Sequence, residues 1–183
     1  MYYRVEVNWN NIGRELETPE CLNPTRTQIS GSQAQWQVLS AIVDESLTSG
    51  LSLLKVSDKY VKQNPFVREI LPGIWEVMFE RVRPVSIPFR RTECAFFFTN
   101  IQDAIIFKNT YPGMELGVLC EVEIIEEDSS FKADMRWLDN IDENTATAAE
   151  AMDALSEYWT GKMTAQPVEE ILFTGKYKLS PVK

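Results

Sequence analysis

The residue types in this chain bound the chemistry that it can perform. None of its 183 residues is a histidine. Nucleophile systems of the Ser-His-Asp and Cys-His types, histidine-ligated metal sites and histidine pH switches are therefore excluded. Acid–base work falls instead to carboxylates, lysine, tyrosine or cysteine. The sequence also lacks the GxxxxGK[ST], GxGxxG and GxSxG motifs. Binding of a nucleotide by a glycine-rich loop is therefore not expected.

Two groups of acidic residues are candidates for a site. Asp139, Asp142 and Glu143 could hold a hard cation, but they lead into a predicted helix. That place favours a solvated loop stabilised by the helix dipole, so we expect no metal. The second group, the acidic run, comprises Glu121, Glu123, Glu126, Glu127 and Asp128. It fits the solvated face of an antiparallel strand, and it also fits a phosphate-mimicking surface for a basic partner.

The overall charge limits the partners of this chain. Lysine and arginine number 18 and aspartate and glutamate 27, which gives a net charge of −9 and a pI near 4.7. Nucleic-acid binding requires a basic footprint, so we expect no extended nucleic-acid surface. A local basic pocket remains compatible with this composition.

Two further features could contact a ligand. Arg4 lies among apolar neighbours in a predicted strand. Its guanidinium either forms an ion pair with a neighbouring strand residue or binds phosphate through two hydrogen bonds. In the run Phe96-Phe97-Phe98, alternation places Phe97 on the face opposite its two neighbours. Such rings are either plain core or a stacking surface for a ligand base.

Elements that position these residues can be placed along the first half of the chain. Residues 2–7 alternate with period two, which predicts a half-buried strand. Residues 8–31 lose periodicity and predict a long irregular connection, of a length that is often functional. Capping boxes predict helices that begin at Ser32, Thr99 and Thr147. Another apolar stripe predicts a helix that begins near Pro72 and ends before Pro84.

Strand signals in the second half complete the predicted fold. Residues 94–98 predict a buried strand, and residues 117–125 and 131–138 predict a pair of strands. Residues 170–173 and 176–179 predict a hairpin or a single bulged strand. Because the strands do not alternate regularly with crossover helices, we expect an α+β fold with a mostly antiparallel sheet. We expect one domain over residues 1–183.

Taken together, several segments resemble the ADP-ribosyltransferase superfamily, most closely an uncharacterised bacterial and phage family within it. The first segment is Tyr2-Tyr3-Arg4 on the opening strand. The others are listed in chain order: Phe79-Glu80-Arg81-Val82-Arg83, Pro88-Phe89-Arg90-Arg91-Thr92 with the strand that follows it, Tyr158-Trp159-Thr160-Gly161, and Glu169-Glu170-Ile171-Leu172-Phe173-Thr174-Gly175. Each segment is short, and their order along the chain carries the resemblance.

The resemblance implies a split, mostly antiparallel sheet with flanking helices that holds NAD in a cleft. NAD is then a substrate, and its ADP-ribose passes to a macromolecular acceptor, for which we expect a protein, or to water. The implied catalytic residue is Glu170, which hydrogen-bonds the nicotinamide ribose. The implied NAD-binding residues are Arg4 for phosphate or ribose, Phe97 for the ring, Thr92 or Thr99 for a hydroxyl, and Arg90 and Arg91 for positive charge.

The chain departs from the family pattern at two points. Members that modify side chains often carry Glu or Gln two positions before the catalytic glutamate, where this chain has Val168, with Glu169 adjacent. The Ser-Thr-Ser middle motif of toxin-type members is absent. These departures leave the acceptor open. The alternative function is a catalytically inactive, acidic binding or inhibitor module that uses the acidic run, which salt should weaken.

The cysteines and the apolar segments indicate a compartment. The chain has three cysteines, Cys21, Cys94 and Cys120, and no CxxC motif. An odd number of cysteines without that motif is typical of a protein in a reducing compartment. The opening residues hold no apolar stretch of signal-peptide length, and no window approaches the length of a membrane span. We therefore expect a cytoplasmic protein without a membrane partner.

Overall fold

The structure is a computed structural model that describes residues 1–19, 32–111, 113–139, 141–142 and 144–183. The chain divides into two compact units. The sheet unit comprises Met1–Leu22, Glu93–Met135 and Met163–Lys183, and the helical unit comprises Asn23–Thr92 and Arg136–Lys162. The expectation of one domain over residues 1–183 stays a prediction.

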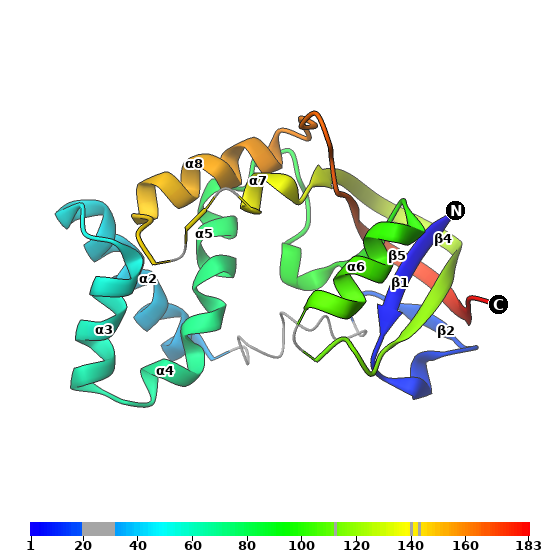
Figure 1. Cartoon of the computed structure of the whole chain (residues 1–183), viewed down its shortest axis with the longest axis horizontal. Coiled ribbons are helices and arrows are strands. Elements are labelled where there is room, and N and C mark those ends of the chain that lie inside the picture. The colour runs from blue at the N-terminus through cyan, green and yellow to red at the C-terminus, as the bar shows by residue number, and fades with distance from the viewer. Residues whose placement is uncertain (20–31, 112, 140, 143) are drawn as a thin grey trace. The chain divides into compact units, whose positions relative to one another are not determined.

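A five-stranded sheet forms the centre of the sheet unit. Its strands are β1 (Tyr2–Glu6), β2 (Glu15–Glu17), β3 (Ala95–Phe98), β4 (Val118–Asp134) and β5 (Glu169–Pro181). Their order is β2-β5-β3-β1-β4, and β4 also pairs with β5, so the pairings of four strands close a ring. All pairings between these strands are antiparallel, which confirms the predicted α+β class. Helix α6 (Ile101–Thr110) lies beside β1 (Figure 1).

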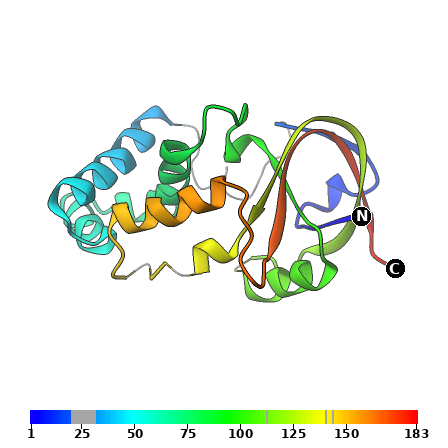
Figure 2. The same ribbon diagram turned by 90° about the horizontal axis from the view of Figure 1, so that it is seen from above.

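Strand β4 corrects the prediction of two strands at 117–125 and 131–138. It is one long strand that curves alongside β5 (Figure 2). Two register shifts interrupt its pairing, between Ile124 and Glu126 and between Glu127 and Ser129. Each inserts an extra residue and bends the strand. The polar residues at these shifts resemble a turn in the sequence, which is why the prediction was wrong there.

Strand β5 is continuous where the sequence left a choice between a hairpin and one bulged strand. Gly175 lies opposite Glu127, beside the bent part of β4, with φ +135°. A Cβ atom at this position would lie 2.1 Å from the carbonyl oxygen of Glu126. Glycine is thus required here for a close approach of two strands, and not for a turn.

Helices α2 (Gln33–Ser49), α3 (Leu53–Gln63), α4 (Val67–Ile70), α5 (Ile74–Val82), α7 (Arg136–Asp139) and α8 (Ala148–Trp159) build the helical unit. Ser32 caps α2 through a 3.4 Å hydrogen bond from the Gln35 N–H, as predicted. Thr147 and Glu150 form the predicted capping box of α8. In the sheet unit, the prediction of Thr99 as the cap of α6 was wrong by one residue, because the Asn100 side chain accepts from the Gln102 N–H.

Buried apolar residues of α2, α5 and α8 form the core of the helical unit. Leu39, Ile42, Val77, Met78 and Leu155 are all fully buried. The Trp159 indole N–H donates to the Phe79 carbonyl oxygen at 3.0 Å and joins α8 to α5. Among the described residues, no helix is both long enough and apolar enough to span a bilayer.

Candidate functional site

The strand register decides which side chains share a face of the sheet. Residues of a strand alternate between faces, and paired residues lie on the same face. Phe97 pairs with Ile171, and Phe98 pairs with Glu170. We call the face with Phe97 the core face, because its buried members form the hydrophobic core of the sheet unit: Leu16, Ala95, Phe97, Cys120, Val122, Ile171, Phe173, Tyr177 and Leu179.

Arg4 lies on the core face, opposite Cys120 of β4. Only 8% of its side chain is exposed, and its Nε donates to Glu6 Oε2 at 3.2 Å. The guanidinium carbon lies 5.9 Å from the centroid of the Tyr177 ring. The ion pair that the sequence suggested for Arg4 is therefore present, with Glu6 as its partner. Phosphate binding by Arg4 stays a prediction, since the hydrogen bond to Glu6 uses only the Nε group of the guanidinium.

Phe97 also lies on the core face, where its ring is fully buried. Its centroid lies 6.2 Å from that of Tyr2, 5.2 Å from that of Phe173 and 5.1 Å from that of Tyr177. These aromatic contacts stabilise the core of the sheet unit. The alternation predicted for Phe96, Phe97 and Phe98 is therefore present, and Phe97 occupies the core side.

A polar cluster lies where β3 ends and β5 begins. The Thr99 hydroxyl donates to Glu169 Oε2 at 2.9 Å, and Lys132 Nζ lies 2.7 Å from the same oxygen. The Lys132 ammonium holds the pKa of Glu169 below its ordinary value, assisted by Thr99 and opposed by partial burial. Glu169 lies two residues before Ile171, so it shares the core face with Arg4 and Phe97.

Glu170 points to the opposite face. It pairs with Phe98 of β3 on one side and Ala133 of β4 on the other, and it is only 2% exposed. The register thus separates Glu170 from Arg4 and Phe97, with which the resemblance groups it. Glu169, by contrast, keeps 26% of its side chain exposed on their face.

Asp134 fixes the chain segment that leads into β5. Its side chain is fully buried, and its two oxygens accept hydrogen bonds from the backbone N–H groups of Thr164 at 2.8 Å and Val168 at 2.9 Å. Bonds between backbone N–H groups and a carboxylate are charge-assisted and strong. Asp134 therefore sets the position at which Glu169 and Glu170 enter the sheet.

Three of the residues assigned to NAD by the resemblance belong to the helical unit. Arg91 is buried, its Nη1 lies 2.6 Å from Glu76 Oε1, and its Cζ lies 4.5 Å from the Phe79 ring centroid. Arg90 is 62% exposed at its side chain and pairs loosely, at 3.7 Å, with Glu80. Thr92 is half-buried in the short helix η3 (Arg91–Glu93).

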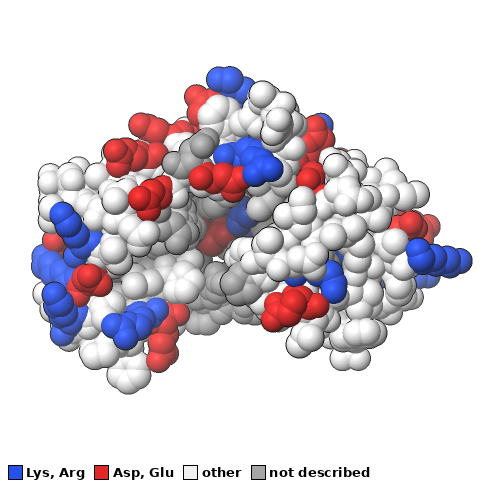
Figure 3. Space-filling view, viewed as in Figure 1, with Lys and Arg blue, Asp and Glu red and all other residues white. Residues whose placement is uncertain are grey.

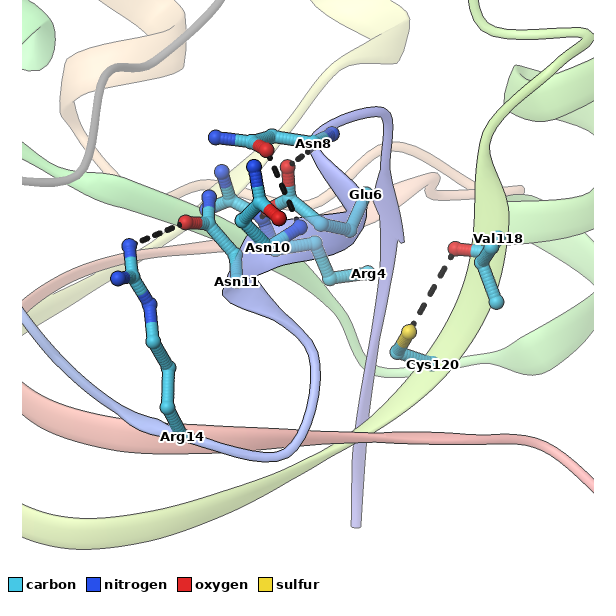
Figure 4. A network of polar contacts seen from close by, with 8 residues as sticks. All are labelled: Arg4, Glu6, Asn8, Asn10, Asn11, Arg14, Val118 and Cys120. Carbon is cyan, nitrogen blue, oxygen red and sulfur yellow. Dashed lines mark hydrogen bonds and ion pairs between the residues drawn. The ribbon is translucent and has the colours of Figure 1, made fainter.

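The turn after β1 holds a polar network (Figure 4). The sequence predicted a long irregular connection over residues 8–31. That prediction was wrong where a short helix and strand β2 form, and residues 20–31 lie outside the described residues. Glu6 Oε1 accepts from the Asn8 N–H at 2.9 Å, and Asn8 Oδ1 caps helix η1 (Trp9–Asn11) through the Asn10 N–H at 3.2 Å. Arg14 Nη2 donates to Asn11 Oδ1 at 2.8 Å. Three asparagines within four residues, followed by an arginine, were the available signal in the sequence.

The cysteines provide no reactive group at this network. Burial, with the nearby Glu6 carboxylate, raises the pKa of the Cys120 thiol to about 11, while Arg4 acts in the opposite direction. A neutral, buried thiol is a poor nucleophile. Cys94 is likewise buried, and Cys21 lies outside the described residues.

The acidic loop before α8 satisfies its own polar groups. Asp142 accepts from the Asn144 N–H at 3.0 Å and from the Thr145 hydroxyl at 2.9 Å, and these bonds lower its pKa. Glu143 lies outside the described residues. In the part of the chain that the structure describes, no three carboxylates or cysteines are grouped to hold a metal ion.

Fold and site define an α+β protein whose antiparallel sheet carries a buried arginine and two adjacent carboxylates at the start of β5. The chain belongs to the DUF2441 family, described as a protein of unknown function, whose model matches residues 14–181. The match covers β2 to β5 and leaves β1 and Arg4 outside it. No curated protein matches the sequence.

Proposed function

We propose that this chain is an NAD-consuming protein of the ADP-ribosyltransferase-like type that acts in the cytoplasm. Breaking the bond between nicotinamide and ribose leaves positive charge on the ribose, while nicotinamide departs with the bonding electrons. A carboxylate held on a rigid strand stabilises that charge as it develops. An oxygen or nitrogen of the acceptor, for which we propose a protein, or of water then bonds to the ribose carbon and releases its proton.

One observation carries this proposal. On the core face, Thr99 donates to the carboxylate of Glu169, and Arg4 and Phe97 lie on that same face. The resemblance asks for a hydroxyl, an aromatic ring, an arginine and a carboxylate in one site. Thr99, Arg4 and Glu169 share this face and support the proposal, in which Glu169 takes the role that the resemblance gives to Glu170, whereas the Phe97 ring is fully buried in the core.

The test measures binding and turnover separately. We expect excess NAD to raise the midpoint of thermal unfolding, because a ligand that binds only the folded chain stabilises it by about 2.7 kcal/mol at a hundredfold excess over its Kd. We expect nicotinamide release from the same sample, measured by chromatography. Adenosine, which lacks diphosphate and nicotinamide, is the matched control ligand. If millimolar NAD neither raises the unfolding midpoint nor releases nicotinamide, the proposal is refuted.

A specific observation favours a second candidate, the acidic binding module. Lys176 of β5 lies between Glu17 of β2 and Glu126 of β4, and Lys178 lies between Glu15 and Glu123. Two lysines thus face the acidic run and two further glutamates across three strands. The remaining carboxylates carry excess negative charge that a basic partner would neutralise. On the face drawn in Figure 3, acidic and basic side chains both lie among uncharged ones.

Salt separates this candidate from the first. A basic protein held by the acidic run should dissociate steeply as ionic strength rises, since exposed charges are screened beyond about 8 Å at 0.15 M. We expect the affinity for a lysine-rich test peptide, measured by fluorescence anisotropy, to fall at least tenfold between 50 and 300 mM salt. The variant Glu123→Gln should weaken binding, and Glu69→Gln, which removes an exposed charge of the helical unit, should not. Equal binding at both salt concentrations would eliminate this candidate.

A further inference from the structure

The charge of the chain is unevenly divided between its two units. The helical unit has 11 basic and 12 acidic side chains, whereas the sheet unit has 7 basic and 15 acidic ones. Their net charges are therefore −1 and −8, and nearly all of the excess negative charge belongs to the sheet unit. Parts of a chain that differ in charge in this way can attract each other between two copies, although the net charge of −9 repels them as wholes.

Helix α3 presents a basic face to solvent. Lys55, Lys59 and Lys62 follow one another at spacings of four and three residues, so they lie along one side of the helix. We call these three residues the basic face of α3. All three are exposed, and among the described residues only Lys59 forms an ion pair, with Glu45 at 2.7 Å. Asp58 is the single acidic residue of α3. In Figure 3, basic side chains lie over α3 and α4, at the left of the view.

Exposed apolar side chains border the basic face of α3. Leu54 is 44% exposed, and Phe66, four residues after Lys62, is 75% exposed. The other side of the helix is covered, because Leu53 and Val56 are buried in the helical unit. Exposed apolar side chains favour association, since a partner that covers them removes their surface from water. The basic face with its apolar border therefore has the composition of a docking surface for an acidic partner.

The acidic run of β4 is complementary to this surface. Glu121 and Glu123 are exposed at alternating positions, so both lie on the face of β4 that points away from the hydrophobic core. Glu126 is paired with Lys176 at 2.9 Å, whereas neither Glu121 nor Glu123 forms an ion pair with a described residue. Ile125 lies within the run and is 46% exposed. The run thus combines charges of the opposite sign with an exposed apolar side chain of its own.

We propose that the basic face of α3 in one copy of this chain docks on the acidic run of a second copy. The contact joins two different surfaces, so each pair of copies keeps one unused basic face and one unused acidic run. Such a head-to-tail contact allows further copies to add. A single exposed ion pair contributes little, so the association is weak and depends on several pairs together with Leu54, Phe66 and Ile125.

This inference deepens the second candidate function: it rests on that candidate for the role of the acidic run, and it names the partner. It does not depend on NAD. The test is sedimentation velocity of the full chain, whose monomer mass is 21.0 kDa, over a range of concentrations at 50 and 300 mM salt. We expect the average mass to rise with concentration at 50 mM salt and to return to the monomer value at 300 mM, because salt screens exposed charges. A monomer at every concentration in 50 mM salt would overturn the inference.

Neutral variants test whether the contact joins these two surfaces. Lys55→Gln/Lys62→Gln removes charge from the basic face, and Glu121→Gln/Glu123→Gln removes it from the acidic run. Each double variant alone should stay monomeric where the unaltered chain associates. An equimolar mixture of the two should form a dimer, because each variant retains the surface that the other has lost. Growth should stop at twice the monomer mass, since the dimer has only neutralised surfaces left.

Two matched controls change exposed charges elsewhere. Lys183→Gln and Asp153→Asn each remove one charge outside the two surfaces and should associate as the unaltered chain does. Unchanged association of either double variant, or a mixture that stays monomeric, would overturn the inference.

The outcomes for this contact and for the proposed functions are distinguishable. Self-association without NAD consumption would keep the contact and refute the NAD chemistry. Binding of a lysine-rich peptide by a chain that stays monomeric would keep the acidic binding module and overturn the contact. A monomeric chain whose basic face binds an RNA duplex or a vesicle of anionic lipid would assign that face to another partner, and this result would also overturn the contact.

Discussion

Glu76→Gln is expected to destabilise the helical unit by about 3–5 kcal/mol, the usual cost of removing one partner of a buried ion pair. Glu76 of α5 is 3% exposed at its side chain and lies 2.6 Å from Arg91, which is 8% exposed. Neutral glutamine removes the carboxylate that lies 2.6 Å from the buried Arg91 guanidinium. The Phe79 ring, 4.5 Å from the guanidinium, stays as a favourable contact for that charge.

The free energy of unfolding is measured by urea titration, with tryptophan fluorescence as the signal. Four of the five tryptophans, Trp36, Trp75, Trp137 and Trp159, belong to the helical unit, so the signal reports mainly on that unit. The control is Asp139→Asn, which breaks an exposed pair with Arg136, in which 57% of the Asp139 side chain is accessible. Exposed pairs contribute about 0–1 kcal/mol, so this variant should unfold almost as the unaltered chain does.

The double variant Glu76→Leu/Arg91→Met distinguishes a structural pair from a ligand site. Replacing both members of a buried pair with apolar residues is often neutral or stabilising, so we expect it to recover most of the lost stability. If it does, and NAD still binds, Arg91 serves the fold and not the nucleotide. A single variant as stable as the unaltered chain would contradict the predicted role of the pair.

Local patterns in the sequence predicted the elements well where one element supplied the whole signal. The cap at Ser32, the capping box at Thr147 and the alternation of β3 depend on residues within one short segment. The prediction failed at β4, because two bulges place polar residues inside a strand. It also left β5 undecided, because Gly175 looks the same in a turn and in a close contact between strands.

The candidate site depends on a different kind of information. Whether Glu169 or Glu170 shares a face with Arg4 follows from pairings between β1, β3 and β5, which lie far apart in the chain. A shift of one residue in any pairing exchanges the two faces. The sequence could therefore name the carboxylates at the start of β5, but only the register separates their roles. The same holds for Asn11, whose burial depends on contacts made by its whole turn.

Glu169→Gln is expected to reduce nicotinamide release about 10²–10³-fold, whereas Glu170→Gln should change it little. The first range is the usual effect of removing one electrostatic contact to a transition state. Glu169 is ionised, half-buried and on the face of Arg4, and its carboxylate accepts from Thr99 at 2.9 Å. Glutamine keeps the size of the side chain and removes only its charge. Glu170 is buried on the other face, where it can act on stability.

The pH profile provides a second readout that a purely structural role would not affect. Lys132 lowers the pKa of Glu169, so turnover should persist as the pH falls to the ordinary glutamate value of 4.5. In Lys132→Met the main cause of that lowering is lost and the pKa of Glu169 rises. The acid limb of the profile should therefore move to higher pH, while Lys62→Met, which alters an exposed lysine of α3, should leave it in place.

Thermal unfolding of each variant shows whether a lost rate reflects lost fold. If Glu169→Gln is folded and fully active while Glu170→Gln is folded and inactive, the charge-stabilising role belongs to Glu170. The nucleotide must then lie on the face of Phe98, and Arg4 cannot contact it from the same side of the sheet. If both variants release nicotinamide at the unaltered rate, neither carboxylate stabilises the ribose. The chemistry proposed for this sheet would then have no residue at β5 to perform it.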